Sequence, residues 1–480
     1  MTFTDGGRKG LWIGGRYGPA ASWMPVVSKA DGRVLAEVGR AGADDARRAV
    51  KAAAEAYPTY RRLPAHVRAA ILYRVAEALE TRREEVARLI AEEAGKPLKA
   101  ARAEVLRAVQ TYRFSAEEAK RIGGETIPMD AAVGGEGRLG FTWREPLGVV
   151  AAITPFNFPL NLVAHKLGPA LAAGNTVVLK PAGATPLSSY FVAELFHEAG
   201  LPAGALNVVS GPGGEIGDAL VEHPDVKAIT FTGSPAVGKR IREKSGLKRT
   251  ILELGSNSAV IVEPDAPFDL AVARTVEGAF QYAGQICISV QRIYVQAEIY
   301  ERFYSALIEK TKALRVGDPR DEATDVGPLI HEGEAARVQA WIEEAVAAGA
   351  RIAAGGRKDG AFLEPTILTD VTSGMKIVRE EVFGPVATLV PYRTLDEAIA
   401  MVNDSKYGLN VGVFTRDIGK AFDAARRLET GGVMINDIPT FRVDHMPYGG
   451  VKESGFGREG VKYAIEELTE LKFVMVNLNF

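Results

Sequence analysis

The chain has 480 residues, of which 47% are hydrophobic and 25% are charged, and its formal net charge is −2. This length is too great for one ordinary domain, and the composition is that of a globular protein with two or three sizeable cores. The near-neutral charge gives no strong field for nucleic acid or an anionic membrane, so we expect neither as a partner.

Cysteine and histidine usage limits the chemistry further. The single cysteine, Cys287, excludes an internal disulfide framework and a cysteine-rich zinc site. The six histidines are scattered without a metal-ligand spacing, so no metal site is predicted. We find no secretory signal pattern and no apolar run of about 18 residues, and we expect a cytoplasmic protein.

The first third of the chain is mostly helical in pattern. Residues 44–122 are rich in Ala, Glu and Arg with helical periodicity, and Pro58, Pro64 and Gly95-Lys96-Pro97 divide them into several helices. A polar, glycine-rich stretch from Gly123 to Gly140 follows. It is compatible with a hairpin that leaves the main body.

From residue 147 onward, short apolar strands alternate with helices. This alternation predicts a parallel sheet that is covered on both faces, and cofactors bind such sheets at the carboxyl ends of the strands. The expected strands are 147–153, 176–179, 206–209 and 226–231, and the expected helices are 161–172, 188–199, 214–222 and 235–245.

A second α/β series begins near Glu253. Its expected strands are 259–262, 292–295 and 431–436, and its expected helices are 269–283, 298–314, 333–348, 395–402 and 418–429. The tail, Glu470–Leu478, alternates apolar and polar residues. It predicts a terminal strand, and such a strand needs a pairing partner.

Two features suggest a nucleotide site, although each has an ordinary structural explanation. Gly233-Ser234-Pro235-Ala236-Val237-Gly238 follows a strand and opens a helix, where free N–H groups can bind a phosphate. A tight strand-to-helix turn would look the same. Lys180 ends a strand, where an ammonium can hydrogen-bond ribose hydroxyls, but a surface lysine would also look the same.

Two further residues are candidates for catalysis. A lone cysteine is usually a small buried hydrophobe, but Gly284-Gln285 before Cys287 indicate a turn rather than a core position. Glu253 stands in the apolar context Leu252-Glu253-Leu254, where an acid is either ion-paired or has a raised pKa that suits a general base.

Seven motifs occur in an order that resembles the aldehyde dehydrogenase superfamily over nearly the whole chain. The closest branches are those of the lactaldehyde, phosphonoacetaldehyde and non-phosphorylating glyceraldehyde-3-phosphate dehydrogenases. The motifs are Thr154-Pro155-Phe156-Asn157-Phe158-Pro159, Leu179-Lys180-Pro181, Phe231-Thr232-Gly233-Ser234, Leu252-Glu253-Leu254-Gly255, Gly284-Gln285-Ile286-Cys287, Glu380-Glu381-Val382-Phe383-Gly384-Pro385 and Pro447-Tyr448-Gly449-Gly450.

The resemblance implies a catalytic set. The Cys287 thiolate would attack the aldehyde, while the Asn157 amide and the Cys287 N–H would bind the oxyanion. Glu253 would activate the water that hydrolyses the thioester. Lys166 and Glu459 match a charged pair that would form a proton path behind the base.

The resemblance also implies an NAD or NADP site. Lys180 and Glu381 would hold the two riboses, Ser234 the pyrophosphate, and Phe383 would pack near the nicotinamide. The whole set is Thr154, Pro155, Phe156, Lys180, Gly183, Gly213, Gly233, Ser234, Leu254, Glu381 and Phe383. Many NAD-dependent members carry a glutamate where this chain has Gly183, so no carboxylate would repel the 2′-phosphate of NADP.

The expected substrate is a small polar or anionic aldehyde: lactaldehyde, glyceraldehyde 3-phosphate, succinate semialdehyde or phosphonoacetaldehyde. The implied tunnel residues are Arg113, Phe158, His165, Ile286, Arg442 and Tyr448. Arg113 and Arg442 suit an anion, but Arg442 paired with Asp444 would be an ordinary structural alternative. Ile286 replaces an arginine of the glyceraldehyde-3-phosphate branch, and Ser256-Asn257 resembles the lactaldehyde and phosphonoacetaldehyde branch.

By the same resemblance we expect two Rossmann-like parallel-sheet domains and a small β oligomerisation domain. Residues 1–120 and 146–252 would bind the cofactor, 253–453 would form the catalytic domain, and 121–145 with 454–480 would pair subunits into a homodimer or homotetramer. Two alternatives remain at this stage: a CoA-acylating relative, against which Glu253 argues, and a non-catalytic descendant of the fold.

Overall fold

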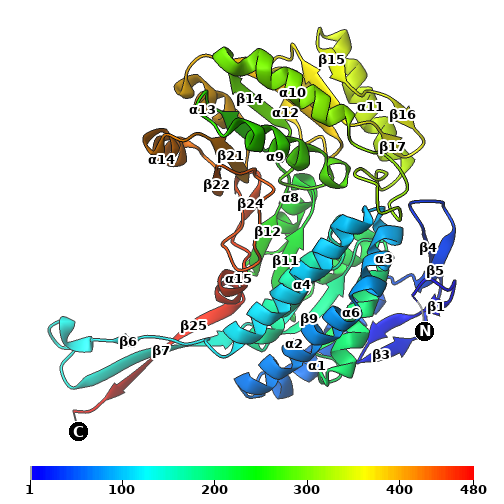
Figure 1. Cartoon of the computed structure of the whole chain (residues 1–480). Helices are drawn as coiled ribbons and strands as arrows, with labels where there is room; N and C mark the ends of the chain where they lie inside the picture. Colours follow the sequence, from blue (N-terminus) through cyan, green and yellow to red (C-terminus); the bar gives the residue numbers. More distant parts are fainter. Residues whose placement is uncertain (1–2, 480) are drawn as a thin grey trace.

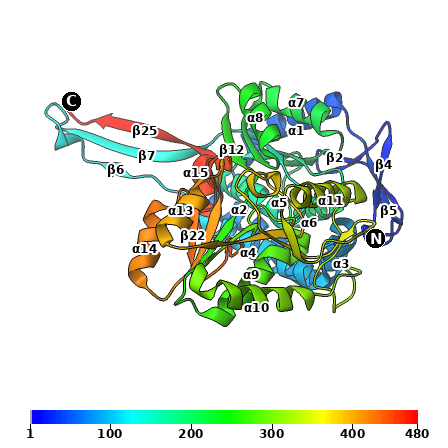
Figure 2. The ribbon, with the colours of Figure 1, turned by 90° about the horizontal axis from the view of Figure 1, so that it is seen from above.

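The computed structural model describes residues 3–479, and these form two α/β bodies and a projecting arm (Figure 1). The first body holds the N-terminal half and the second body lies above it in that view. The arm leaves the first body on one side, as Figure 2 also shows. No helix among the described residues is long and apolar enough to cross a membrane.

The first body is built on a sheet of eight strands, in the order β24-β12-β11-β8-β9-β10-β2-β3. The five central strands are parallel, and β24, β2 and β3 are antiparallel additions at the edges. The strands are β2 (Leu11–Ile13), β3 (Arg16–Gly18), β8 (Val149–Ile153), β9 (Thr176–Lys180), β10 (Leu206–Val208), β11 (Val226–Thr232), β12 (Arg249–Glu253) and β24 (Gly455–Phe456).

Helices cover both faces of this sheet, as the alternating pattern predicts. One face carries α1 (Ala43–Tyr60), α7 (Gly213–Glu222) and α8 (Pro235–Lys244). The other carries α5 (Asn161–Ala173) and α6 (Leu187–Glu198), with α2 (Ala65–Thr81), α3 (Arg83–Ala94), α4 (Leu98–Ala119) and α15 (Val461–Glu467) packed outside. Every residue of β8 and β9 is buried, which explains why both read as continuous apolar runs.

The second body has a seven-stranded sheet in the order β15-β18-β19-β14-β13-β21-β22, parallel except for β15. Its strands are β13 (Ala259–Val262), β14 (Arg292–Gln296), β15 (Arg351–Ala354), β18 (Thr366–Thr369), β19 (Val386–Tyr392), β21 (Asn410–Phe414) and β22 (Gly432–Ile435). Its helices are α9 (Phe268–Phe280), α10 (Tyr300–Lys312), α11 (Glu332–Ala347), α12 (Lys376–Arg379), α13 (Leu395–Asn403) and α14 (Ile418–Arg427).

The remaining elements are short strands and the arm. The short strands are β1 (Arg8–Lys9), β4 (Trp23–Val27) and β5 (Val34–Gly39) in one sheet, the pair β16 (Lys358–Asp359) and β17 (Phe362–Leu363), and the pair β20 (Tyr407–Gly408) and β23 (Val451–Lys452). Single 3-10 turns span Met129–Ala131, Gln281–Gly284 and Ala297–Ile299. The arm consists of β6 (Thr126–Ile127), β7 (Arg138–Pro146) and β25 (Thr469–Asn477).

The structure departs from the sequence-based expectations in several places, among them β15, β18, β19 and β21 of the second sheet, which had no predicted counterpart. The strands between residues 8 and 39 had no predicted counterpart, because they are short and mix polar and apolar residues. Glu253 ends β12 and therefore belongs to the first sheet rather than to the second series. Residues 454–468 were assigned to the arm, but β24 pairs with β12 and α15 packs on α5, so only β25 belongs to the arm at that end.

A buried ion pair fixes the start of α5, the helix that carries His165 and Lys166. The Glu104 carboxylate accepts hydrogen bonds from the backbone N–H groups of Leu160 and Asn161, at 2.9 and 3.1 Å. Its other oxygen is paired with the Lys96 ammonium, and both side chains are buried. A carboxylate at a helix N-terminus satisfies free N–H groups and is favoured by the helix dipole, so this contact orients α5.

Candidate active site

A cleft of about 350 Å³ lies where the carboxyl ends of the first sheet meet the second body. The residues that follow β8, β11 and β12 form one wall, since parallel strands end at the same edge. The second body supplies the other wall from the Cys287 loop, α11 and the loop after α12. The lining residues are Pro155, Phe156, Asn157, Thr232, Gly233, Ser234, Leu254, Gly255, Cys287, Glu334, Arg337, Glu381 and Phe383.

The loop after α12 brings Glu381 and Phe383 to the cleft. The Gln291 amide fastens this loop, because it donates to the Glu380 carbonyl at 2.7 Å and accepts from the Val382 N–H at 3.0 Å. Glu381 accepts a hydrogen bond from the Ser256 N–H at 3.0 Å, and burial raises the pKa of its carboxyl to about 7. Phe383 has a left-handed φ of 49° and meets the Phe156 ring edge-on at 5.8 Å.

Lys180 ends β9 as a buried cation. Its ammonium donates to the Pro181 carbonyl at 3.1 Å and forms no ion pair with any described carboxylate. Burial alone lowers the pKa of Lys180 to about 8. A buried ammonium with one carbonyl partner can still bind ligand hydroxyl or phosphate oxygens, so the residues present fit a nucleotide with ribose groups.

Four of the predicted cofactor residues do not line this cleft: Thr154, Lys180, Gly183 and Gly213. Thr154 is buried, and its N–H donates to the Lys180 carbonyl at 3.1 Å, next to Lys180 itself. Gly183 and Gly213 are both exposed, and a Cβ at either position would meet open space. Thr232, Gly255, Glu334 and Arg337 line the cleft but were not predicted as site residues, and no motif marks Glu334 and Arg337 on α11.

The Cys287 loop is an irregular turn held from several sides. Tyr282, Ala283 and Gly284 follow one another with left-handed φ values of 50°, 52° and 68°, so the helix expected to continue to residue 283 ends earlier. A Cβ on Gly284 would lie 2.1 Å from the Gly384 carbonyl oxygen, so only glycine fits there. The Gln285 side chain accepts from the Ile330 N–H at 2.9 Å and anchors the loop.

Asn157 and Cys287 approach one another through this loop. The Asn157 side-chain amide donates to the Gln285 carbonyl at 2.9 Å, and its oxygen has no hydrogen-bond partner among the described residues. Cys287 is half-buried, and its Sγ lies 2.9 Å from the hydroxyl of Tyr448. Burial raises the pKa of the Cys287 thiol to about 12, although Tyr448 and Arg442 both act in the opposite direction.

Glu253 is wholly buried at the end of β12. Neither carboxylate oxygen has a hydrogen-bond partner among the described residues. Burial raises the pKa of Glu253 well above its ordinary value, and the negative charge of Glu459 adds to this shift. A carboxyl group in this state is an unpaired titratable group beside the cysteine, as the apolar sequence context suggested.

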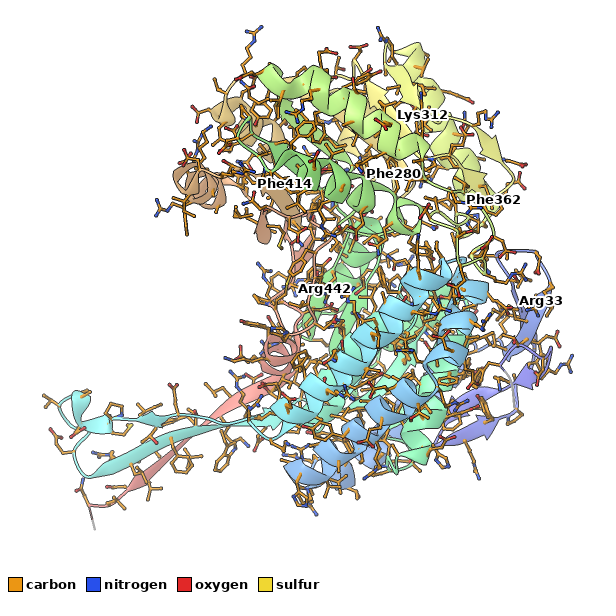
Figure 3. The ribbon with its side chains drawn as sticks, in the orientation of Figure 1. Arg33, Phe280, Lys312, Phe362, Phe414 and Arg442 are labelled. Carbon is orange, nitrogen blue, oxygen red and sulfur yellow. The ribbon has the colours of Figure 1, made fainter. Side chains whose placement is uncertain are left out.

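A cluster of buried charges lies next to these groups and outside the cleft lining. The Lys166 ammonium pairs with Glu459 at 3.0 Å and donates to Thr230 at 3.1 Å. Arg442 pairs with the other Glu459 oxygen at 3.1 Å. Although burial alone would raise the pKa of Glu459, these two cations lower it to about 2. Figure 3 shows Arg442 where the two bodies meet.

His165 and Asp444 complete the charged cluster. Asp444 accepts from the His165 ring at 2.8 Å, from Arg107 at 2.8 Å and from Asn161 at 3.1 Å. Burial would raise the pKa of Asp444, but the His165 and Arg107 contacts hold it well below its ordinary range. Burial, reinforced by Arg442, lowers the pKa of His165, so the ring is the neutral member of the cluster.

Not all predicted substrate residues join this group. The Arg113 guanidinium pairs with Glu80 on α2 at 2.5 Å, which matches the structural explanation rather than a tunnel position. Arg442 does not pair with Asp444, whose cationic partner is Arg107, a residue that the sequence analysis missed. Phe158 lies 3.5 Å beneath the Lys96 ammonium, and Ile286 is buried in the loop before Cys287. No group of His, Cys, Asp and Glu that could hold a metal occurs among residues 3–479.

Comparisons with known proteins identify the family of the chain. The Aldehyde dehydrogenase family profile matches residues 17–474. The chain is 52% identical to 3-sulfolactaldehyde dehydrogenase of Priestia aryabhattai over 98% of both chains, and 41% identical to lactaldehyde dehydrogenase of Methanocaldococcus jannaschii over 95% and 97%.

Solved structures give the same result. Aldehyde dehydrogenase 21 of Physcomitrella patens, in complex with succinate, has a TM-score of 0.96 and 39% identity over 98% of both chains. Glyceraldehyde-3-phosphate dehydrogenase of Methanocaldococcus jannaschii, complexed with NADP, has a TM-score of 0.92 and 40% identity over 95% and 99%. These findings confirm the resemblance and the predicted fold class. The chain belongs to the aldehyde dehydrogenase family, and it is an oxidoreductase that acts on an aldehyde.

Proposed function

We propose that this enzyme oxidises a short anionic aldehyde to the carboxylate, through a thiohemiacetal and a thioester on Cys287. The observation that carries the proposal is that Cys287 and Asn157 meet at the cleft, while the buried Glu253, at the end of β12, lies close enough for its charge to act on Cys287. A nucleophile, an amide donor and an unpaired carboxyl group are what acyl transfer to water requires.

The protein groups act in sequence. The Cys287 sulfur bonds to the aldehyde carbon, and the carbonyl oxygen becomes an oxyanion that the Asn157 amide and the Cys287 N–H stabilise. A nicotinamide cofactor bound in the cleft would supply the acceptor for the hydride that leaves this carbon. Glu253 then takes a proton from a water molecule, whose oxygen bonds to the thioester carbon as the C–S bond breaks.

The buried Lys166 and Glu459 pair would set the field in which Glu253 gains and loses its proton, although no hydrogen bond among the described residues joins Glu253 to the pair. The Glu459 and Lys166 pair lies behind Glu253 and is itself fully buried, so it can hold a fixed field without exchanging with bulk water. The negative charge of Glu459 adds to burial in raising the pKa of Glu253, which supports a role in which the pair controls when the base is charged.

NADP or NAD would occupy the cleft. Lys180 and Glu381 are suited to the ribose hydroxyls, and Ser234, with the start of α8, is suited to the pyrophosphate. Exposed Gly183 leaves room, and no carboxylate, beside the adenosine ribose. We therefore infer that NADP is accepted.

An excess of positive charge supports an anionic substrate. In the charged cluster that Arg442 links to Cys287, three cations (Lys166, Arg107 and Arg442) face two ionised carboxylates, Glu459 and Asp444, because His165 favours its neutral form. The cluster thus holds one more positive than negative charge, and this excess would attract an anion. The 52% identity to a 3-sulfolactaldehyde dehydrogenase points to a three-carbon aldehyde with a strong acid group.

The arm supports assembly into a homodimer or homotetramer. Its strands expose the large apolar side chains of Leu139, Trp143, Leu471, Phe473 and Met475. Leu139 and Trp143 lie on one face of the arm and Leu471, Phe473 and Met475 on the other, so both faces expose apolar side chains that a second copy of this chain would cover. A cytoplasmic location and the lack of a nucleic-acid or membrane partner stay predictions.

Replacing Arg107 tests the anionic substrate. Arg107→Met should lower kcat/KM for 3-sulfolactaldehyde about tenfold and leave that for neutral lactaldehyde within about twofold, since a tenfold loss is about 1.4 kcal/mol of anion attraction. Steady-state kinetics with both aldehydes measures this. Arg113→Met, on the same helix, is the matched control and should change neither value. Equal losses for both aldehydes in Arg107→Met would contradict the charge argument.

The protonation of Glu253 has a consequence for stability. A pKa raised in the folded state means that the folded protein holds a proton that the unfolded chain releases above about pH 4.5. Stability from this group is therefore full below that pH and is lost as pH rises toward the folded pKa. Glu253→Gln and Glu253→Leu should both gain stability relative to wild type between pH 5 and 8, by at most about 1.4 kcal/mol per pH unit. Denaturant unfolding at several pH values measures this, and a constant difference would show that Glu253 is ionised throughout.

The cofactor preference can be changed at one exposed position. Gly183→Glu should lower kcat/KM for NADP at least about tenfold relative to NAD, because the new carboxylate would face the 2′-phosphate. Gly183→Gln has the same shape without the charge and should shift the ratio much less. Kinetics with each cofactor at a fixed aldehyde concentration decides, and an unchanged ratio in Gly183→Glu would place the 2′-phosphate elsewhere.

A further inference from the structure

Tyr448 is the hydrogen-bond partner of the Cys287 sulfur among the described residues. Its hydroxyl lies 2.9 Å from Sγ, and its ring is buried. Two backbone hydrogen bonds with Glu459, of 3.0 and 2.7 Å, hold Tyr448 in place. The hydroxyl therefore reaches the sulfur from a fixed position, on the side of Cys287 that does not line the cleft.

The Arg442 guanidinium stacks on the face of the Tyr448 ring. Its guanidinium carbon lies 3.7 Å from the centre of the Tyr448 ring. The Glu459 carboxylate, at 3.1 Å, and His165 Nδ1, at 3.4 Å, accept from one terminal nitrogen, while the buried Nε has no hydrogen-bond partner among the described residues. A cation against the face of a phenol withdraws electron density from the ring, so the O–H becomes a stronger donor.

A thiolate at Cys287 needs such a donor. The half-buried sulfur loses much of its hydration, and burial favours the neutral thiol. The charged or titratable groups that face the sulfur are Tyr448, Arg442, Glu381 and Glu253. The last two are carboxyl groups that disfavour a thiolate when ionised, so only Tyr448 and Arg442 favour it. A hydrogen bond to an ionised acceptor is stronger than one to a neutral acceptor.

We propose that Tyr448 is a catalytic residue that donates its phenolic O–H to the Cys287 thiolate, and that Arg442 is a positioning residue that acts through the Tyr448 ring. When the thiolate forms, the S–H bond breaks, its proton passes to water, and Tyr448 keeps its own proton as the donor. The inference rests on the proposed role of Cys287 as the nucleophile, and it adds the group that makes this nucleophile reactive.

Alkylation of the single cysteine tests the proposal directly. Iodoacetamide reacts with the thiolate, and intact mass reports Cys287 alone because the chain has no other cysteine. The full-length protein is used without aldehyde or cofactor, from pH 6 to 10. Tyr448→Phe should shift the alkylation profile by about one unit to higher pH, and should slow alkylation at pH 8 about tenfold.

A matched control removes a buried phenolic hydroxyl that does not contact Cys287. Tyr60, in α1, is equally buried, and its hydroxyl donates to the Leu171 carbonyl at 3.0 Å. Tyr60→Phe should leave the alkylation profile unchanged. If Cys287 in Tyr448→Phe is alkylated as fast as in wild type, or faster, the hydroxyl does not activate the cysteine and the proposal fails.

A double-mutant cycle tests the part of Arg442. Arg442→Lys keeps the charge but loses the planar contact with the ring, and should slow alkylation about threefold. In the Tyr448→Phe background the same change should have an effect of less than twofold, because the hydroxyl that Arg442 acts on is gone. Equal effects in both backgrounds would overturn the positioning role. If Arg442→Lys does not fold, Tyr448→Phe still decides the role of the tyrosine.

The result does not depend on the proposed substrate. Loss of aldehyde oxidation in Cys287→Ser tests the nucleophile, whereas alkylation needs neither aldehyde nor cofactor. If the wild-type enzyme oxidises the aldehyde but Tyr448→Phe keeps the wild-type alkylation profile, the proposed function stands and the role of Tyr448 is refuted.

Discussion

Burial of ionisable side chains at the junction of the two sheets determines what the groups around Cys287 can do. In this position water cannot stabilise a charge, so each group is either paired or favours its neutral form. Glu459, Asp444, Lys166 and Arg107 are paired, whereas Glu253 and Cys287 are not, and the pKa of each is raised. The nucleophile and the base that the chemistry uses are thus both left without an ionic partner.

The fold produces this arrangement through two constraints. Parallel strands end at one edge, so the segments after β8, β11 and β12 bring Asn157, Ser234 and Leu254 to one cleft, with Glu253 buried next to Leu254. The Cys287 loop enters from the second body through three consecutive left-handed residues, a conformation with a cost that the Gln285 and Asn157 contacts offset. Binding and chemistry therefore depend on how the two bodies meet.

Much of this was predictable from sequence, for physical reasons. Buried parallel strands such as Val149–Ile153 are continuous apolar runs, and Cys287 and Glu253 stand in ordered motifs with distinct chemistry. The short strands before residue 40 have no such pattern. Arg107 and Arg113 illustrate the limit: six residues on α4 separate them by about 240° around the helix, so only one can face Asp444. The partner itself lies far away in sequence, and no local pattern indicates it.

Trapping the acyl-enzyme tests the central claim, that Cys287 carries the substrate carbon and Glu253 releases it. Glu253→Gln would be mixed with aldehyde and NADP, the reduced cofactor followed by rapid absorbance, and the protein examined by mass spectrometry of its peptides. The account predicts a burst of about one reduced cofactor per subunit, slow turnover afterwards, and an acyl mass on the peptide that contains Cys287. A burst without an acyl group on that peptide, or full steady turnover in Glu253→Gln, would contradict it.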